Sequence, residues 1–207
     1  MTATLTTPSP SGKLTSLTHP DLACPPRFAT PRNLDRPTLG GKVAEVAKML
    51  GYPLMPWQRY VADVVMELDP VTGRLYYREW TLLVPRQSGK TTLILALAVH
   101  RCRAWSDRQN VRYAAQTRND AKTKWEDDHV VTLEASLFGK RKPKPYRVRK
   151  TTGSEAIIWD NGSMHGIVSN TEKAGLGTDA RPTPESASSY RTAVEPGVSI
   201  PGSRGGP

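Results

Sequence analysis

The residues best suited to do chemistry lie in one short run, residues 84–92, which reads Val-Pro-Arg-Gln-Ser-Gly-Lys-Thr-Thr. Gly89, Lys90 and Thr91 have the order found in phosphate-binding loops, where backbone N–H groups cradle phosphates, the lysine reaches the β and γ phosphates and the hydroxyl ligates magnesium. The strict pattern requires glycine six positions before the lysine, and this chain has Val84 there. The run therefore predicts nucleotide phosphate binding, against the alternative of a loop that contains Gly-Lys-Thr ahead of a buried helix.

The segments on either side of the loop favour the phosphate-binding interpretation. Residues 80–84 form an apolar run typical of a strand, and residues 91–99 form an apolar run of helix length. A strand must lead into such a loop and a helix must leave it, because the helix N-terminus contributes N–H groups and a favourable dipole. The predicted nucleotide contacts in the loop are Arg86, Gln87, Ser88, Gly89, Lys90, Thr91 and Thr92.

Periodicity and turn residues predict the other elements. We expect helices over residues 43–50, from Pro56 to about 68, and after Thr117 to about 137. Strands are expected at residues 75–77, 80–84 and 111–115, and a hairpin turning at Asn161-Gly162 between residues 156–159 and 164–168. Strands that alternate with helices predict an α/β fold of the P-loop NTPase type, a parallel sheet flanked by helices.

Composition divides the 207 residues into three parts. Residues 1–38 are rich in Thr, Ser and Pro and predict a disordered arm. Residues 39–177 carry the strand and helix patterning of an α/β sheet domain that is incomplete at its C-terminal side. Residues 178–207 lack any run of buried type and predict a disordered, non-native-looking tail. Cys24 and Cys102 have no CxxC spacing, so we expect neither a disulfide nor a zinc site, and a reducing, intracellular setting. The longest apolar run is far too short to cross a bilayer, so we expect no membrane partner.

The net charge of +10 favours a polyanionic partner such as nucleic acid. Much of the charge lies in residues 140–150, which ends in a strand-like segment and contains no acidic residue. Charge runs are more often solvated loops, and with a single aromatic in the run that remains the favoured interpretation. The alternative is contact with DNA phosphates by Lys140, Arg141, Lys142, Lys144, Arg147, Arg149 and Lys150.

Over about residues 40–177 the chain resembles the N-terminal ATPase domain of the large terminase subunit, the motor that packages DNA into tailed-phage heads. The resemblance rests on an ordered set of segments. These are Pro56-Trp57-Gln58-Arg59, the loop Arg86-Gln87-Ser88-Gly89-Lys90-Thr91-Thr92, Tyr113-Ala114-Ala115-Gln116-Thr117, Trp159-Asp160-Asn161-Gly162-Ser163 and Gly175-Leu176-Gly177. The family's loop tolerates loss of the first glycine and carries an arginine inside it.

The resemblance implies roles for individual residues. Gln58 would contact adenine, because its amide offers both a donor and an acceptor, unless it is a surface glutamine on an amphipathic helix. Arg86 would stabilise charge on the transferring phosphoryl group together with Lys90, unless it bonds a backbone carbonyl. ATP and Mg²⁺, held by Thr91, would be the cofactors. Double-stranded phage DNA, the small terminase subunit and the portal would be the partners, in the cytoplasm of an infected or lysogenic bacterial host. The motor is a homo-oligomer in the family, a state we do not expect for this chain.

The chain departs from the family after Gly177. The family continues with an apolar strand ending in Asp-Glu, whose acids position magnesium and the attacking water. Here Asp179 and Glu185 follow no apolar strand and are separated by two prolines, which a central strand does not tolerate. We expect a truncated or frameshifted, hydrolysis-defective ATPase domain without a nuclease domain, and place no catalytic acid. Translating the DNA downstream of codon 177 in three frames tests this expectation.

Two other functions remain open on the sequence. A helicase-like, DNA-translocating P-loop ATPase would share the glutamine motif and the loop, but would need further motifs of its own. A non-enzymatic nucleotide-binding or DNA-binding remnant would bind ATP without turnover.

Overall fold

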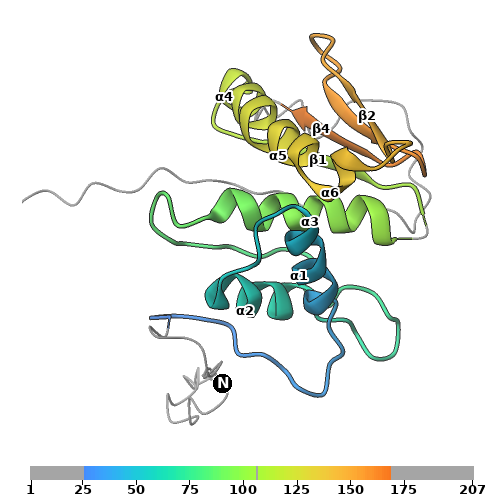
Figure 1. Ribbon diagram of the computed structural model, residues 1–207. Helices are drawn as coiled ribbons and strands as arrows, with labels where there is room; N and C mark the ends of the chain where they lie inside the picture. Colours follow the sequence, from blue (N-terminus) through green and yellow to red (C-terminus); the bar gives the residue numbers. More distant parts are fainter. Residues whose placement is uncertain (1–25, 106, 169–207) are drawn as a thin grey trace, which may run out of the picture.

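The computed structural model describes residues 26–105 and 107–168. The elements divide into a helical part and a part built on a sheet (Figure 1). The long helix α3 belongs to the helical part and lies between its other two helices and the sheet. The helices of the first part are α1 (Gly40–Met49), α2 (Pro56–Val65) and α3 (Lys90–Ala104). The second part contains α4 (Arg118–Lys124), the π-helix η1 (Trp125–Val130), α5 (Val131–Ala135), α6 (Leu137–Lys140) and strands β1 (Asn110–Ala114), β2 (Tyr146–Arg149), β3 (Ala156–Trp159) and β4 (Met164–Val168).

Helices α1 and α2 cross closely because of a glycine. A Cβ on Gly40 would lie 2.6 Å from the Cα of Asp63, so no side chain fits at this crossing. The start of α2 at Pro56 follows from the fixed φ of proline, which suits the first helical turn. The prediction of a helix start there is confirmed, and the helix predicted over residues 43–50 is present as α1.

The four strands form a mixed sheet in the order β1-β4-β3-β2. Strands β1 and β4 pair in parallel, whereas β3 pairs antiparallel with both β4 and β2. The α/β class and the Asn161-Gly162 hairpin are therefore confirmed, but the sheet, which was expected to be parallel, is only partly parallel. The hairpin itself accounts for the difference, since a tight turn at Gly162, with φ of 78°, joins antiparallel neighbours.

Two predicted strands are wrong. Residues 80–84 have no ladder partner among the described strands, although they keep the alternation of a strand. Trp80 and Leu82 pack against the core while Leu83 is 81 % exposed. Of residues 75–77, only Leu75 forms an isolated bridge, to Leu68. Apolar alternation predicted an extended chain correctly, but it could not supply the neighbouring strand that a ladder requires.

The helix predicted from Thr117 to about 137 is divided. The Thr117 side chain caps α4 by accepting a hydrogen bond from the N–H of Asp120, as expected. A π-helical stretch follows. At Ser136 the backbone is extended, which ends α5, and the Ser136 side chain caps α6. The η1 segment buries Trp125 and His129 beneath the sheet, where the His129 ring lies 4.7 Å from that of Tyr113.

The expected disordered arm, residues 1–38, overlaps the described residues 26–38. Arg32 and Arg36 of that overlap both form ion pairs with Glu67, whose side chain is fully buried. The Tyr60 hydroxyl donates to the Thr30 carbonyl at 2.8 Å. The described part of this segment is thus held against the end of α2. In the part of the chain that the structure describes, no helix is long and apolar enough to span a membrane.

Candidate nucleotide-binding site

The predicted phosphate loop lies at the N-terminus of α3. Gly89 precedes the helix with φ of 87°, a left-handed conformation that glycine adopts without steric cost. Gln87 also has a positive φ, 60°, which is uncommon for a residue with a side chain and marks local strain. No side chain caps the start of α3. The first N–H groups of this 15-residue helix are therefore available to an anion.

Gln58 of α2 joins that helix to the loop. Its Nε2 donates to the Gly89 carbonyl at 2.8 Å, and its Oε1 accepts from the Met55 N–H at 2.7 Å. The side chain is only 1 % exposed. In this arrangement Gln58 positions the loop, because one of its N–H groups and one of its oxygen lone pairs are already engaged.

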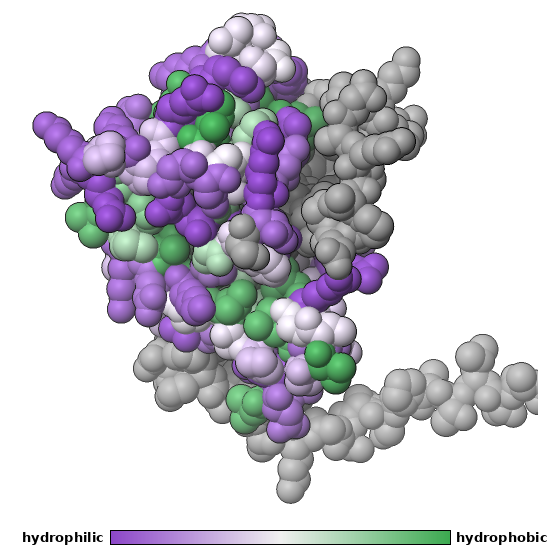
Figure 2. Space-filling model, turned by 90° about the vertical axis from the view of Figure 1, so that its right-hand side faces the viewer, coloured by the Kyte–Doolittle hydropathy of each residue, from purple (hydrophilic) through white to green (hydrophobic). Residues whose placement is uncertain are grey.

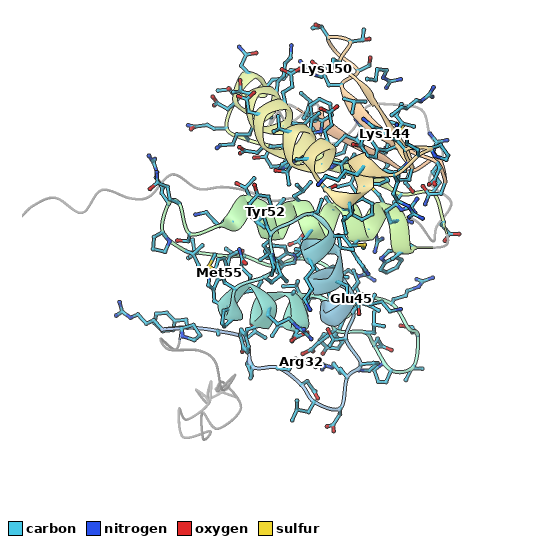
Figure 3. The ribbon with its side chains drawn as sticks, in the orientation of Figure 1. Arg32, Glu45, Tyr52, Met55, Lys144 and Lys150 are labelled. Atoms are coloured by element: carbon cyan, nitrogen blue, oxygen red, sulfur yellow. The ribbon has the colours of Figure 1, made fainter. Side chains whose placement is uncertain are left out.

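Met55 is a site residue that the sequence did not indicate. A Cβ on Gly89 would lie 2.8 Å from both the Met55 Cε and the Gln58 Nε2, so α2 and the loop meet at Gly89. Met55 is nevertheless 44 % exposed. In Figure 3 its side chain and that of Tyr52 lie on the segment that joins α1 to α2, in front of α3. A methionine before a helix-starting proline is ordinary, so its position next to the loop could be found only from the structure.

The Lys90 ammonium folds back onto its own loop. Its Nζ donates to the Val84 carbonyl at 2.7 Å and to the Pro85 carbonyl at 3.2 Å. The Ser88 hydroxyl also donates to the Pro85 carbonyl, at 2.9 Å. The positive charge is thus held within the loop by neutral acceptors, which leaves it uncompensated and suited to an incoming anion.

The remaining predicted contacts line the same loop. Arg86 and Gln87 are exposed, whereas Ser88, Thr91 and Thr92 are half-buried. The structure therefore gathers Gln58 and the loop residues at one place. It does not bring the basic run of residues 140–150 there, since Lys144 and Lys150 lie on the β2 side of the molecule, well away from Met55 (Figure 3).

The predicted glycine turn at residues 175–177, and Asp179 and Glu185, lie outside the described residues. The geometry of the site consequently comes from the loop, α2 and α3. It offers a helix N-terminus, a lysine and an exposed arginine around a glycine turn, groups whose chemistry is suited to a phosphate.

Comparison with known proteins gives a family match that includes the loop. Residues 81–181 match the family model described as terminase large subunit, T4likevirus-type, N-terminal. The match begins just before the loop and extends past β4. No curated protein and no solved structure matches the chain.

Proposed function

We propose that the chain is the ATP-binding part of a motor that packages phage DNA, because its residues 81–181 match the N-terminal family of the large terminase subunit. The observation that carries the proposal is the loop of residues 84–92, set at the uncapped N-terminus of α3. The fold of the chain would then be of the P-loop NTPase type, and residues 84–92 would be a Walker A loop that lacks the first glycine.

The residues present fit ATP with Mg²⁺. The N–H groups at the start of α3 and the Lys90 ammonium would bind the β and γ phosphates, and the Thr91 hydroxyl would ligate the magnesium. Arg86, exposed beside them, would neutralise charge on the terminal phosphate. Magnesium when bound would neutralise and orient the phosphates.

Gln58 supports the loop in this proposal. Its hydrogen bond to the Gly89 carbonyl fixes the glycine turn, and its buried amide ties that turn to α2. The adenine contact expected of Gln58 would have to use the remaining hydrogen-bonding capacity of an amide that is buried in this structure. Met55, exposed beside Gly89, would then offer an apolar surface to the nucleoside.

We also propose that the chain binds ATP without turning it over. Residues 178–207 offer no apolar strand that ends in carboxylates, so no group is assigned to activate water. Steady phosphate release by the full chain, lost on Lys90→Ala, would overturn this part while leaving ATP binding intact. By its resemblance to this family, the chain would have duplex phage DNA, the small terminase subunit and the portal as partners, and it would act in the host cytoplasm.

Equilibrium binding of a fluorescent ATP analogue to the full chain tests the proposal. Lys90→Ala removes the ammonium that would contact the phosphates, so affinity should fall at least tenfold. Lys48→Ala, an exposed lysine on α1, is the matched control and should bind as the parent does. Equal binding by the parent and Lys90→Ala would contradict phosphate binding by this loop.

A further inference from the structure

The register of the sheet separates its side chains onto two faces. On one face, Tyr113 and His165 contact His129 of η1, and Trp159 contacts Phe138 of α6. Successive residues of a strand point to opposite faces, so their neighbours form the other face. That outer face consists of Asn110, Arg112, Ala114, Arg147, Arg149, Ala156, Ile158, Met164, Gly166 and Val168.

The outer face is positively charged at both edges. Register pairs place Arg149, Ala156, Gly166 and Arg112 in one row across the four strands. The outward positions of these described strands hold three arginines and no acidic residue. Figure 2, viewed from the right-hand side of Figure 1, shows hydrophilic side chains over much of the upper half of the molecule, with smaller apolar patches between them.

Small residues let arginine side chains lie along this face. The Arg112 Nη1 would be 3.7 Å from a Cβ placed on Gly166, so its guanidinium extends over the middle of the sheet. Arg108, which precedes β1, reaches the same face, where its Nη2 lies 3.7 Å from the Met164 Sδ. Arg149 Nε donates to the Ser154 carbonyl, which holds that side chain at the β2 edge.

Among the residues that the structure describes, no ion pair involves the arginines of this face. The ion pairs of the described residues use other side chains, such as Arg103 with Asp160 and Arg118 with Glu155. All four arginines, Arg108, Arg112, Arg147 and Arg149, are exposed. Their guanidinium groups can therefore bind anions without first breaking an internal ion pair.

We propose that this outer face binds the phosphate backbone of duplex DNA. Its cationic edges, β1 and β2, are three strand spacings apart, about 14 Å, which suits phosphates on either side of a DNA groove about 12 Å wide. Arg147 and Arg149 lie about 7 Å apart along β2, so they reach successive phosphates. Single-stranded DNA is usually held by stacking on aromatic rings, and the outward positions of the described strands carry none.

This inference deepens the proposed packaging function and rests on it for the choice of DNA. It also divides the basic run of the sequence. Arg147 and Arg149 belong to the face, whereas Lys142 and Lys144 lie in the loop before β2. Arg108 and Arg112, outside that run, are added to the contact surface because the register brings them opposite it.

Fluorescence anisotropy of a 30-base-pair duplex with the full chain, over a series of salt concentrations, tests the proposal. The slope of log K against log salt falls by about 0.9 for each phosphate contact removed. Arg112→Ala should lower the slope by about 0.9 and Arg147→Ala/Arg149→Ala by about 1.8. Lys42→Ala/Lys48→Ala, on α1, should leave it unchanged, and Lys142→Ala/Lys144→Ala should change it less than the arginine pair does.

Several distinct results would overturn the proposal that this outer face binds DNA. Unchanged DNA binding by both arginine variants would refute it, as would an equal loss from Lys142→Ala/Lys144→Ala, which would assign binding to the linear run. Tighter binding of single strands than of duplex would also refute it. ATP binding, measured on the same variants, should persist and shows that they are folded. If the parent binds no ATP but the arginine variants lose DNA, the nucleotide function fails and this surface stands.

Discussion

At the scale of single residues, the account depends on Gly89 and its two neighbours, Gln58 of α2 and Met55, which precedes α2. Gly89 combines a left-handed backbone with side-chain atoms 2.8 Å from where a Cβ would be. Gln87, two residues earlier, also has a positive φ, although it carries a side chain. The two positions therefore respond in opposite ways to substitution.

Gly89→Ala should lower the free energy of unfolding by about 1–3 kcal/mol, because the new methyl strains the backbone and displaces Gln58 or Met55. It should also weaken ATP binding. Gln87→Gly removes the backbone strain of a residue with a side chain in the left-handed conformation. It should leave the free energy of unfolding unchanged or raise it by up to about 1 kcal/mol. Chemical denaturation of both variants measures the difference, and equal stabilities would contradict the described loop.

Gln58 gives a second test at this scale. Gln58→Leu leaves the Met55 N–H and the Gly89 carbonyl without their partner, at a cost of about 1–3 kcal/mol in unfolding free energy. Gln58→Glu keeps the acceptor for Met55, but it places a buried carboxylate oxygen against the Gly89 carbonyl, so it should cost at least as much as Gln58→Leu. A surface glutamine would show neither effect in denaturant titrations, and that result would remove its positioning role.

At the scale of elements, the first test concerns the crossing of α1 and α2, the helix that carries Gln58. Helices α1 and α2 fit closely only because Gly40 has no side chain. Gly40→Ala should force α1 away from α2 and lower the unfolding free energy by about 1–3 kcal/mol. Gly41→Ala is the control, since a Cβ there meets only the flexible Arg59 side chain at 3.5 Å. Thermal melts of the two variants decide, and a Gly40→Ala protein as stable as the control would contradict the crossing.

The sequence predicted those elements whose signals are local. Pro56 at a helix start, Thr117 as a cap and Asn161-Gly162 as a turn each act through their own backbone, and each is found where predicted. Residues 80–84 were placed wrongly in a ladder because pairing depends on a neighbour far along the chain. The arginine face escaped notice for the same reason, since Arg112 and Arg149 face the same side only once the register is known.

The candidate site was predicted in part. Spacing indicated the loop from Arg86 to Thr92 and, with the family resemblance, Gln58. Nothing in the sequence indicated that Met55 touches Gly89 or that Lys90 bonds the Val84 carbonyl, because both are contacts that only the folded chain creates.

At the scale of the whole molecule, three buried histidines link stability to pH. Burial lowers the pKa of His100 to about 4, helped by Lys42 and Arg101, and burial alone lowers that of His165 to about 4. Burial, with His165 and Lys124 nearby, holds the pKa of His129 well below 6.5. Both nitrogens of His100 and of His129 are buried without hydrogen-bond partners.

Stability should therefore fall as the pH drops from about 6.5 towards about 4. In that window the unfolded histidines bind protons that the folded ones do not, and each contributes a loss of about 1.4 kcal/mol per pH unit. His129→Phe, which keeps a ring beside Tyr113, should flatten this dependence. Melting temperatures at pH 7, 6 and 5 check it, and identical pH profiles for the parent and the variant would contradict the buried neutral imidazole.

The central claim, that residues 84–92 hold the phosphates of ATP, is tested most directly by a thermal melt of the full chain with Mg²⁺ and either ATP or AMP. Ligand at one hundred times its Kd stabilises the folded state by about 2.7 kcal/mol. The account predicts that ATP raises the melting temperature of the parent clearly more than that of Lys90→Ala. AMP lacks the β and γ phosphates, so it should raise the melting temperature of either protein much less than ATP raises that of the parent. Equal shifts of the parent with ATP and AMP, or a shift with ATP that is as large in Lys90→Ala as in the parent, would contradict it.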